Sequence, residues 1–568
     1  MREDALGMAA AGLAAGLAAA GLREAVVCPG TRSTPLALAL DRHPAIRVWV
    51  HLDERSAGYF ALGLARGQRR PAAILTTSGT AVANLLPAVM EASHGGGALV
   101  VLSADRPPEL RQVGASQTVD QVNVFGPAVK ASWDLPVPDL AVPGAHWVMA
   151  GVRAAAAAAA APAGPVQVNV PLREPLLPTW PDEGAVPPAA AVHQSILVTD
   201  WEALADFGRD EVQGVIVAGA EDLSGAAAAI RWLADQWQWP VWADPLSNLR
   251  GRIPTIATYD WLARSLPDAW RPHRILRVGP IPTSKAAGQL MARVPTGVVD
   301  HPGRWRDPAG SAAAWFSADL GQWDREVRPE LADARRGSAW VAEWRKADEA
   351  AQRLLAQRLA AAPPSLSSRW AHELAAVVPD DAVVMVGNSL PVRDLDKFFW
   401  GSDRFGVYGN RGVSGIDGVA STGLGIAAGR AQRLVLVVGD LSFLHDANGW
   451  LPVAPYGLSA SVLVVNNDGG GIFNTLSQVS LPPQQFERLF GTPHGLDLAG
   501  IAALYGGRYC EASTWRHAAA ALAAEAREPG LSVVDWHTAP RAAYAAWQAS
   551  AEAWLCEQVA REVWRGAV

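Results

Sequence analysis

Short aliphatic runs recur along the chain, each followed by a glycine-rich turn and then by a stretch rich in alanine and leucine. They fall into three sets: "AVVCPG", "AAILTTSG", "ALVVLSADRP" and "VQVNVPL"; "GVIVAGAED", "PVWADP", "RILRVGP" and "GVVDHPG"; and "AVVMVGNS", "RLVLVVGD", "SVLVVNND" and "LSVVDWH". Runs of this kind, bounded by turns, are typical of buried parallel strands that alternate with helices. The sequence therefore predicts an α/β protein of three α/β domains with mainly parallel sheets.

Composition indicates where these domains meet. The chain has 568 residues, which is too long for a single hydrophobic core. Residues 171–192 are rich in proline, as linkers often are, and residues 336–365 are charged with a helical pattern. We predict three domains, at residues 1–180, 192–345 and 360–568.

Charge and cysteine content exclude several classes of protein. The net charge is −7 and there is no long basic run, which argues against a nucleic-acid partner. No stretch of strongly apolar residues is long enough for a membrane span. The alanine-rich start carries Glu3 and Asp4 and is predicted to be a first helix rather than a targeting segment. Three widely spaced cysteines without a CxxC pair favour a reducing compartment, so we expect a cytoplasmic protein.

Two neighbouring aliphatic runs end in polar residues. "VLVVGDLSFLHDANGW" places Asp440 after one run, and "VLVVNNDGGGIF" places Asn467 and a glycine cluster after the next. Carboxylate, amide and carbonyl oxygens suit Mg²⁺, which often shares its shell with phosphate oxygens. Glycines let the backbone approach a bulky anion. The sequence predicts a magnesium–diphosphate site, and the alternative is a helix cap at Asp440 beside an ordinary turn.

These two segments match the thiamine-diphosphate signature, a glycine–aspartate pair followed by an asparagine pair, although Leu441 stands where the signature usually has glycine. The chain resembles the 2-succinyl-5-enolpyruvyl-6-hydroxy-3-cyclohexene-1-carboxylate (SEPHCHC) synthase family. The matching segments are "CPGTRSTPLALAL", "HLDERSAGYFALGLARG", "TTSGTAVANLLPAVMEA", "SADRPPELRQVGASQTVDQ", "GNSLPVRDLDKF", "NRGVSGIDGVASTGLGIA", "GDLSFLHDANG" and "VVNNDGGGIF". The middle of the chain resembles the family only through "GPIPTSK".

The resemblance implies a thiamine-diphosphate-binding fold and assigns residues to it. The implied metal ligands are Asp440, Asn467 and the carbonyl oxygen of Gly469, with Mg²⁺ as the metal and Mn²⁺ as an alternative. The implied cofactor-binding residues are Glu54, Asn388, Ser389, Ile416, Gly439, Asp440, Leu441, Ser442, Asn467, Gly469, Gly470 and Ile472. Among them, Ile416 would hold the cofactor bent.

Glu54 follows an aliphatic run in "VWVHLDERSAG". A glutamate in an apolar pocket at a strand end has a raised pKa and can share a proton with the pyrimidine ring of the cofactor. Taken alone, Glu54 would be read as an acid in the first turn of a helix, with Asp53 as its cap. The resemblance implies the activating role instead. It also implies that the domains of Glu54 and Asp440 meet between subunits, so the smallest active unit is a homodimer, alone or in a dimer of dimers.

Four arginines, Arg32, Arg106, Arg393 and Arg411, are predicted to lie in glycine- or proline-rich turns after strands. The guanidinium group matches a carboxylate with two hydrogen bonds, so several arginines at one cleft indicate substrates with several carboxylates. The family's substrates, 2-oxoglutarate and isochorismate, fit this expectation. By resemblance the catalytic residues are Glu54, Arg32, Ser33, Arg106, Gln117, Lys285, Ser389, Arg393, Arg411, Ile472 and Phe473.

The implied reaction is decarboxylation of 2-oxoglutarate and addition of the resulting carbanion to isochorismate, a transferase step of menaquinone biosynthesis. The chain has no His-His pair, which thiamine decarboxylases commonly use for protonation, and this absence favours carbon–carbon ligation. One alternative is another thiamine-dependent carboligase, such as an FAD-binding acetohydroxyacid synthase. A second is a nucleotide-binding module built on "GLGIAAG" at 423–429. Its spacing departs from the dinucleotide fingerprint, so we interpret those glycines as helix packing.

Overall fold

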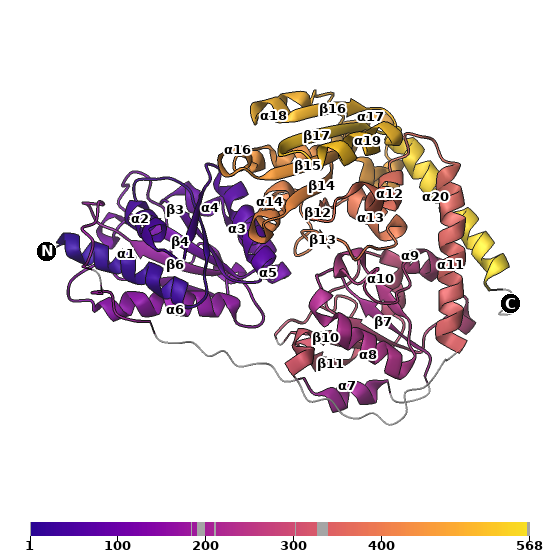
Figure 1. Cartoon of the computed structure of the whole chain (residues 1–568), viewed down its shortest axis with the longest axis horizontal. Helices are drawn as coiled ribbons and strands as arrows, with labels where there is room; N and C mark the ends of the chain where they lie inside the picture. The colour runs from indigo at the N-terminus through magenta and orange to yellow at the C-terminus, as the bar shows by residue number, and fades with distance from the viewer. Residues whose placement is uncertain are drawn as a thin grey trace.

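The chain folds into three α/β units that follow one another along the sequence, each built on one β-sheet (Figure 1). The computed structural model describes residues 2–182, 184–189, 199–208, 212–301, 303–325 and 339–564. Within these residues every strand pairing in the three sheets is parallel. The predicted α/β class is confirmed, and every predicted aliphatic run forms a strand.

The first sheet has the strand order β2-β1-β3-β4-β6-β5. Its strands are β1 (Glu24–Val27), β2 (Arg47–Val50), β3 (Ala72–Thr76), β4 (Leu99–Asp105), β5 (Ala131–Asp134) and β6 (Val166–Pro171). Its helices are α1 (Arg2–Ala19), α2 (Thr34–Arg42), α3 (Glu54–Gln68), α4 (Thr80–Ala83), α5 (Leu86–Gly95) and α6 (Gly144–Ala159). The predicted first helix is α1, which lies beside α6.

The second sheet has the order β11-β10-β9-β7-β8. Its strands are β7 (Gly214–Ala218), β8 (Val241–Ala243), β9 (Arg274–Val278), β10 (Thr296–Asp300) and β11 (Ala312–Ser317). Its helices are α7 (Trp201–Phe207), α8 (Ala227–Trp237), α9 (Tyr259–Arg264) and α10 (Lys285–Met291).

The third sheet has the order β13-β12-β14-β15-β17-β16, which is the order of the first sheet when each is numbered from its own first strand. Its strands are β12 (Ala382–Val386), β13 (Gly406–Tyr408), β14 (Arg433–Gly439), β15 (Ser459–Asn466), β16 (Arg508–Ala512) and β17 (Gly530–His537). The remaining helices are α11 (Ala339–Ala360), α12 (Arg369–Val377), α13 (Leu390–Phe398), α14 (Val419–Arg430), α15 (Asp440–His445), α16 (Val453–Tyr456), α17 (Pro483–Phe486), α18 (Ala499–Leu504), α19 (Trp515–Glu525) and α20 (Arg541–Glu562).

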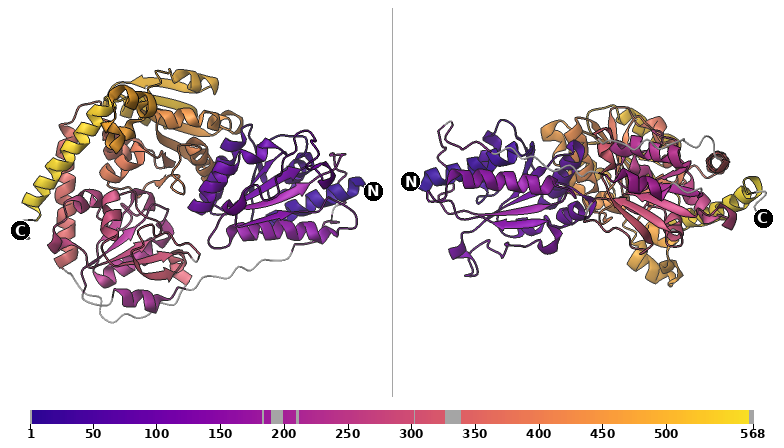
Figure 2. Two further views of the ribbon diagram at one scale, coloured as in Figure 1. Left: turned by 180° about the vertical axis from the view of Figure 1, so that it is seen from behind. Right: turned by 90° about the horizontal axis from the view of Figure 1, so that it is seen from below.

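The first and third α/β units meet through α3 and α14, and the long helices α11 and α20 run along the opposite side of the molecule (Figure 2). At the α3–α14 crossing, a Cβ on Gly63 would lie 2.2 Å from the Thr422 carbonyl oxygen. A Cβ on Gly425 would lie 2.2 Å from the Phe60 carbonyl oxygen. The two backbones can approach this closely only because glycine has no side chain. The interpretation of 423–429 as a helix-packing segment is confirmed.

The segment that follows β6 agrees with part of the predicted linker. Residues 172–182 and 184–189 contain no helix or strand, and positions 183 and 190–192 lie outside the described residues. The predicted helical segment 336–365 corresponds to α11, with 336–338 also outside them. The division into domains at 1–180, 192–345 and 360–568 stays a prediction. None of the described helices is both long and apolar enough to cross a membrane.

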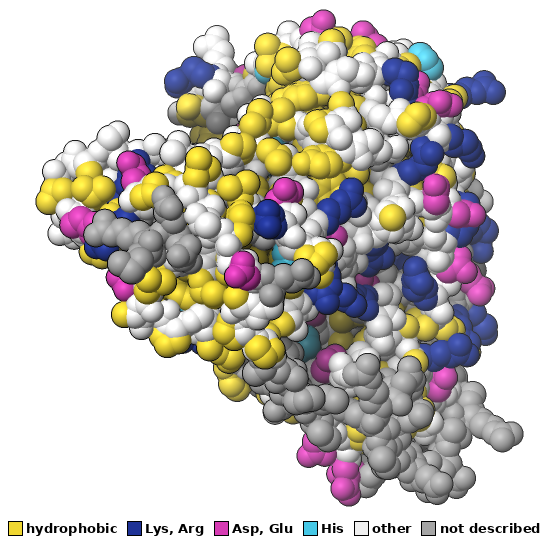
Figure 3. Space-filling model, turned by 60° about the vertical axis from the view of Figure 1, so that its left-hand side comes forward, with side chains coloured by type: hydrophobic (Ala, Val, Ile, Leu, Met, Phe, Trp, Pro, Cys, Tyr) yellow, Lys and Arg dark blue, Asp and Glu magenta, His cyan; other side chains and the backbone are white. Residues whose placement is uncertain are grey.

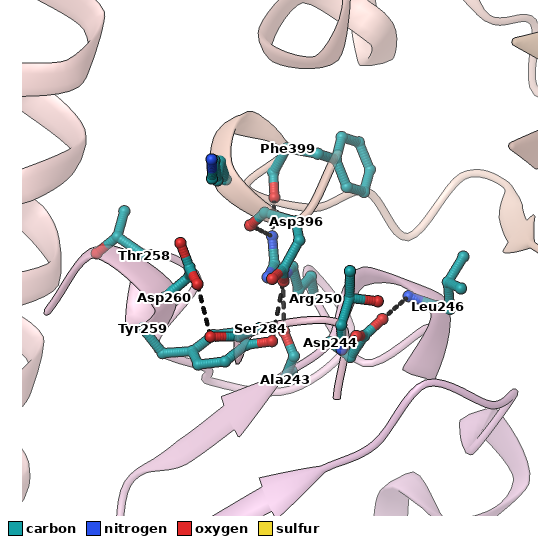
Figure 4. Close-up of polar contacts among 12 residues, drawn as sticks. Ala243, Asp244, Leu246, Arg250, Thr258, Tyr259, Asp260, Ser284, Asp396 and Phe399 are labelled. Atoms are coloured by element: carbon teal, nitrogen blue, oxygen red, sulfur yellow. Dashed lines mark hydrogen bonds and ion pairs between the residues drawn. The ribbon is translucent and has the colours of Figure 1, made fainter. Parts of the chain in front are cut away.

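A buried ion pair joins the second α/β unit to the third (Figure 4). Arg250 Nη2 lies 2.9 Å from Asp396 Oδ1, and Arg250 Nε donates to the Ala243 carbonyl at 2.7 Å. Tyr259 donates its hydroxyl to the same carboxylate oxygen at 2.9 Å. Burial, followed by the nearby charge of Asp244, raises the pKa of Asp396 to about 8. The ionised carboxylate therefore depends on these donors.

We expect Arg250→Ala to weaken this contact between units. Removing one partner of a buried ion pair typically costs about 3–5 kcal/mol, because the other charge is left without compensation. The measurement is the urea midpoint of unfolding. Arg252→Ala is the matched control, since Arg252 lies in the same loop and is exposed. Equal midpoints for the two variants would show that the buried pair contributes no net stability.

Candidate active site

The site lies where the strand order of the third sheet reverses. β12 has β13 on one side and β14 on the other, so a topological switch point, called the crevice of the third sheet below, lies at the carboxyl ends of β12 and β14. Ligands of open α/β sheets bind in such crevices. Asn388 and Ser389 follow β12, Gly439 and Asp440 span the end of β14 and the start of α15, and Asn467 follows the neighbouring strand β15.

The predicted oxygen donors lie on adjacent loops that a hydrogen bond holds together. Asp440 Oδ2 accepts from the Gly469 amide at 2.7 Å, and its Oδ1 accepts from the Leu441 amide at 2.9 Å. Asn467 Oδ1 is buried and has no hydrogen-bond donor among the described residues. A buried acceptor without a donor is costly, and a bound cation would satisfy it. One carboxylate, one amide oxygen and one carbonyl form a donor set that fits Mg²⁺.

The glycine cluster packs against another segment of the same chain. A Cβ on Gly469 would lie 2.0 Å from the Gly491 carbonyl oxygen, and a Cβ on Gly470 would lie 2.1 Å from the Phe490 carbonyl oxygen. Gly469 also has φ +127°, which side chains disfavour. Glycine is required here by the approach of residues 490–491, a reason that the sequence did not reveal.

His494 touches the predicted metal ligand and was not predicted from the sequence. Its Nε2 lies 3.3 Å from Asp440 Oδ2, and its Nδ1 accepts from the Leu496 amide at 3.0 Å. Because Nδ1 is an acceptor, Nε2 carries the proton in the neutral ring and donates to Asp440. Burial raises the pKa of Asp440. His494 follows Thr492 and Pro493 in a turn, and no spacing rule relates it to Asp440.

Asn388 connects the two loops of the crevice. Its Nδ2 donates to the carbonyls of Asn410 at 2.8 Å and Gly415 at 2.7 Å, and its Oδ1 accepts from Arg411 Nη1 at 2.8 Å. Ser389, the next residue, has φ +70°. Strained backbone of this kind persists only where its surroundings enforce it. Asn388, Ser389 and Arg411, which the resemblance assigns to the site, therefore lie together, and their roles stay predictions.

Further predicted residues line the same end of the sheet. Ser442 Oγ donates to the Ile416 carbonyl at 2.9 Å, and the Ile416 residue is 38% exposed. Ile472 and Phe473 lie in a short 3₁₀ helix, Gly471–Thr475, that follows the glycine cluster.

The prediction that all four arginines lie in turns is wrong for Arg393, which lies inside α13. Its guanidinium donates back to the Ser389 carbonyl, at the residue that precedes the helix. Burial, followed by the charge of Arg411, lowers the pKa of Arg393. The charge of Arg411, which lies in a loop, thus acts on Arg393, which lies in a helix.

A second crevice with the same topology lies at the first sheet, between the loops after β1 and β3. Arg106 donates to Ser78 Oγ, and Gln117 Nε2 donates to the Ser78 carbonyl at 3.0 Å. Arg32 follows β1; burial, followed by the charge of Arg106, lowers its pKa, and its Nε is buried without an acceptor among the described residues. Ser33 Oγ donates to the Gly30 carbonyl of its own loop at 2.9 Å. Ser78 is not among the residues predicted for the site, although its position in "TTSGT" directly after a strand marks it as a loop residue at the carboxyl end of the sheet.

Glu54 is the first residue of α3, and Asp53 caps the helix as predicted. The Glu54 side chain is partly buried and makes no hydrogen bond or ion pair with another described residue. Its neighbour Arg55 donates to the His445 carbonyl at the far end of α15. Within the described chain, no hydrogen bond or ion pair links Glu54, Arg32, Ser33, Arg106 or Gln117 to the crevice of the third sheet.

Lys285 begins α10 of the second α/β unit and is exposed. It makes no hydrogen bond or ion pair with either crevice in the part of the chain that the structure describes. Its role in the site stays a prediction.

Comparison with known proteins agrees with this geometry. Residues 8–124 match the family model of the thiamine pyrophosphate enzyme N-terminal TPP binding domain, and residues 395–536 match that of the C-terminal TPP binding domain. The chain is 42% identical over 536 residues to a SEPHCHC synthase of Chloroflexus aurantiacus, covering 90% of each chain. It is 40% identical to that of Bacillus velezensis (90% of this chain, 92% of the relative) and 39% identical to that of Geobacillus kaustophilus (94% and 95%). The chain therefore belongs to the 2-succinyl-5-enolpyruvyl-6-hydroxy-3-cyclohexene-1-carboxylate synthase family of thiamine pyrophosphate enzymes.

Proposed function

We propose that the protein decarboxylates 2-oxoglutarate and joins the remaining four carbons to isochorismate, a transferase reaction of menaquinone biosynthesis that depends on thiamine diphosphate and Mg²⁺. The observations that support this most directly concern the predicted oxygen cluster of Asp440, Asn467 and Gly469: Asp440 Oδ2 accepts from the Gly469 amide, and Asn467 Oδ1 is buried without a donor among the described residues. The family models support the cofactor, and the names of the relatives support the product. An acetohydroxyacid synthase is not favoured, because the relatives carry the other name.

In this proposal Asp440, Asn467 and the Gly469 carbonyl would hold the metal, which would neutralise charge on the diphosphate; Mn²⁺ is an alternative metal. Gly439, Leu441, Ser442 and Gly470 line the same loops. The bound cofactor supplies a carbon nucleophile for the keto group of 2-oxoglutarate. The three free cysteines of the described chain agree with a reducing, cytoplasmic location.

Glu54 is proposed to hold the proton that it shares with pyrimidine N1′. It has no partner of its own among the described residues, so its carboxyl group is available to a ligand. Ile416 is proposed to hold the cofactor bent, since the residue is partly exposed and its backbone carbonyl accepts from Ser442.

The arginines are proposed to orient the substrate carboxylates. Arg32 has a buried Nε without an acceptor among the described residues, and the positive charge of Arg411 lies near enough to Arg393 to lower its pKa, after the larger effect of burial. Two close guanidinium groups repel each other unless an anion lies near both. Ser33, Arg106, Gln117, Ser389, Ile472, Phe473 and Lys285 are proposed to complete the pocket.

A homodimer, alone or within a dimer of dimers, is proposed to complete each site. The structure forms two crevices, and in the described residues no polar contact connects Glu54 with the oxygen cluster of its own chain. Hydrophobic side chains cover much of the face drawn in Figure 3. Exposed apolar residues also flank the predicted site residues, Leu52 (67%) near Glu54 and Val413 (45%) near Arg411. Exposed apolar surface of this kind is typical of contacts between subunits.

Mixing two inactive variants tests the shared site. A dimer of one Glu54→Gln chain and one Asp440→Ala chain has one site with both changes and one site with neither. We expect such mixtures to regain up to about half of the specific activity of wild type per mixed dimer, since one intact site remains. Native mass spectrometry counts the mixed dimers. Mixed dimers that form but stay inactive would show that each chain builds its own site.

The activity itself is tested by incubating the protein with isochorismate, 2-oxoglutarate, thiamine diphosphate and Mg²⁺, followed by mass analysis of the product. The expected product has the mass of SEPHCHC and requires all four components. Purified protein that is yellow from bound FAD, with no such product, would favour the acetohydroxyacid synthase alternative.

A further inference from the structure

A carboxylate of the first α/β unit holds the loop that carries Arg411. Glu91 lies on α5 and is fully buried. Its Oε1 accepts from the Gly412 amide at 2.9 Å, and its Oε2 accepts from the Val413 amide at 2.8 Å. Both carboxylate oxygens thus bind consecutive backbone amides directly after Arg411. These contacts cross from the first sheet to the crevice of the third.

Arg66 completes this contact from α3. Its Nη2 donates to Glu91 Oε1 at 3.1 Å, and its Nη1 donates to Asn410 Oδ1 at 2.9 Å. Asn410 in turn donates to Thr422 Oγ1 at 3.1 Å on α14. The residues before and after Arg411 are therefore both held, one through Arg66 and the other directly by Glu91.

The loop approaches α5 as closely as a backbone can. A Cβ on Gly412 would lie 2.7 Å from both the Glu91 carbonyl oxygen and the Gly95 amide nitrogen. Only glycine permits this approach, so the glycine at position 412 allows the loop to reach the Glu91 carboxylate. On the other side of the loop, the Arg411 guanidinium is fixed to Asn388 Oδ1.

We propose that Glu91 and Arg66 are positioning residues: they fix the backbone on both sides of Arg411, so that the first α/β unit sets the geometry with which the third unit of the same chain binds a substrate carboxylate. This inference rests on the proposed function, because it takes Arg411 as a substrate-binding residue. Neither Glu91 nor Arg66 is a catalytic residue in this account, since both act through the loop.

The chemistry of the contact favours positioning over stability alone. Burying a charged pair usually stabilises a protein no more than apolar residues of the same volume would. A carboxylate, however, can accept from two adjacent backbone amides, which apolar packing cannot do. The two hydrogen bonds fix the direction of the loop backbone. This direction determines the position of the Arg411 Cα atom and the direction in which its side chain leaves the loop.

The first experiment measures the loop without reference to activity. Hydrogen–deuterium exchange of the full-length protein, read by mass spectrometry on peptides covering 409–418, is compared between wild type and Glu91→Gln. The amide side chain keeps the shape but has only one acceptor oxygen, so at least one loop amide loses its partner. We expect exchange of this segment to accelerate about tenfold, the equivalent of about 1.4 kcal/mol. Unchanged exchange would overturn the proposal.

The second experiment separates positioning from folding by steady-state kinetics. Glu91→Gln is expected to raise the KM of at least one substrate acid about tenfold, equivalent to about 1.4 kcal/mol. Thiamine diphosphate binding and hydrogen exchange at its C2 atom should stay within about twofold, since the hydrogen-bond partners of Glu91 and Arg66 among the described residues do not include Asp440, Asn467 or Gly469. Arg66→Met should likewise raise the KM while leaving thiamine diphosphate binding and C2 exchange unchanged, because it removes the hydrogen bonds to both Asn410 and Glu91.

A double-mutant cycle then tests whether Glu91 acts through Arg411. The double variant Glu91→Gln/Arg411→Ala should have a KM within about twofold of Arg411→Ala alone, because a missing guanidinium cannot be mispositioned. Additive effects of the two changes would overturn the inference. If wild type forms no SEPHCHC, the proposed function fails instead, and the exchange experiment still decides whether Glu91 holds the loop.

Glu24→Gln is the matched control. Glu24 is also a buried glutamate of the first α/β unit and accepts from Trp49 at 2.7 Å and Gln68 at 2.6 Å, but it does not contact the Arg411 loop. The Glu24→Gln variant should have a lower midpoint of thermal unfolding than wild type. Both the hydrogen–deuterium exchange of residues 409–418 and the KM values should stay unchanged. An equal rise in KM for Glu24→Gln and Glu91→Gln would show a general loss of structure and overturn the assignment.

Discussion

Asp440→Ala is expected to abolish activity and to weaken the retention of thiamine diphosphate. Asp440 is the only carboxylate in the proposed donor set, and it also holds the Gly469 amide, whose residue supplies the carbonyl ligand. Changing a residue that merely supports a metal ligand typically costs about 10–100-fold in affinity or activity, so losing the charged ligand itself should cost at least about 100-fold. Titration calorimetry with thiamine diphosphate and Mg²⁺ measures the affinity.

Two further variants make this result specific. Asp440→Asn keeps the size of the side chain but removes its charge, and it should also lose most of the metal affinity. Asp497→Ala is the control, because Asp497 is an exposed carboxylate of the following segment that accepts from the Ala499 amide. Full activity of Asp440→Ala with bound thiamine diphosphate would remove Asp440 from the site.

Glu54→Gln is expected to leave cofactor binding almost unchanged and to slow C2 hydrogen exchange of thiamine diphosphate by about 10²–10⁴-fold, the usual range of general acid–base help. The glutamine has the same shape but cannot share a proton with N1′. NMR of deuterium incorporation at C2, read beside steady-state kinetics, measures the effect. Exchange as fast as in wild type would require the activating acid to lie elsewhere.

Neighbouring residues supply the controls for this prediction. Asp53→Asn changes the adjacent acid, which caps α3 through the amides of Arg55 and Ser56, and it should leave C2 exchange intact. Arg393→Ala and Arg411→Ala should likewise keep C2 exchange and instead weaken the use of the substrate acids, by about 1.5–3 kcal/mol for each lost carboxylate contact.

Most of the sheet core could be predicted from the sequence, whereas among the edge strands only β8 falls in one of the predicted runs. Interior strands such as β12 are buried on both faces and are continuous runs of apolar residues. The strands absent from the prediction, β2, β5, β11, β13 and β16, all lie at sheet edges. In β16 the exposed residues Arg508 and Glu511 interrupt the apolar pattern, because an edge strand has no neighbour on one side to cover it.

The site residues likewise include some that local sequence patterns predict and others that they do not. Asp440 and Asn467 could be placed together because both follow strands, and adjacent parallel strands end at one edge. His494 and Glu91 reach the crevice from other parts of the chain, so no local pattern points to them. Arg393 was misplaced because "SLPVRD" reads as a proline turn, whereas Pro391 lies in the first turn of α13, where its missing amide hydrogen is tolerated.

The close crossing of α3 and α14 bears on how sequence variants of this enzyme should be interpreted. Gly63 and Gly425 carry no chemical group, yet a single added methyl at either position would meet the opposite backbone at 2.2 Å. Overpacking a tight interior typically costs about 1–3 kcal/mol, and here the displaced helices also carry Glu54 at one end and Arg66 near the other. A glycine-to-alanine variant at this crossing would thus rank as damaging, whereas a survey of polar side chains alone would classify it as neutral.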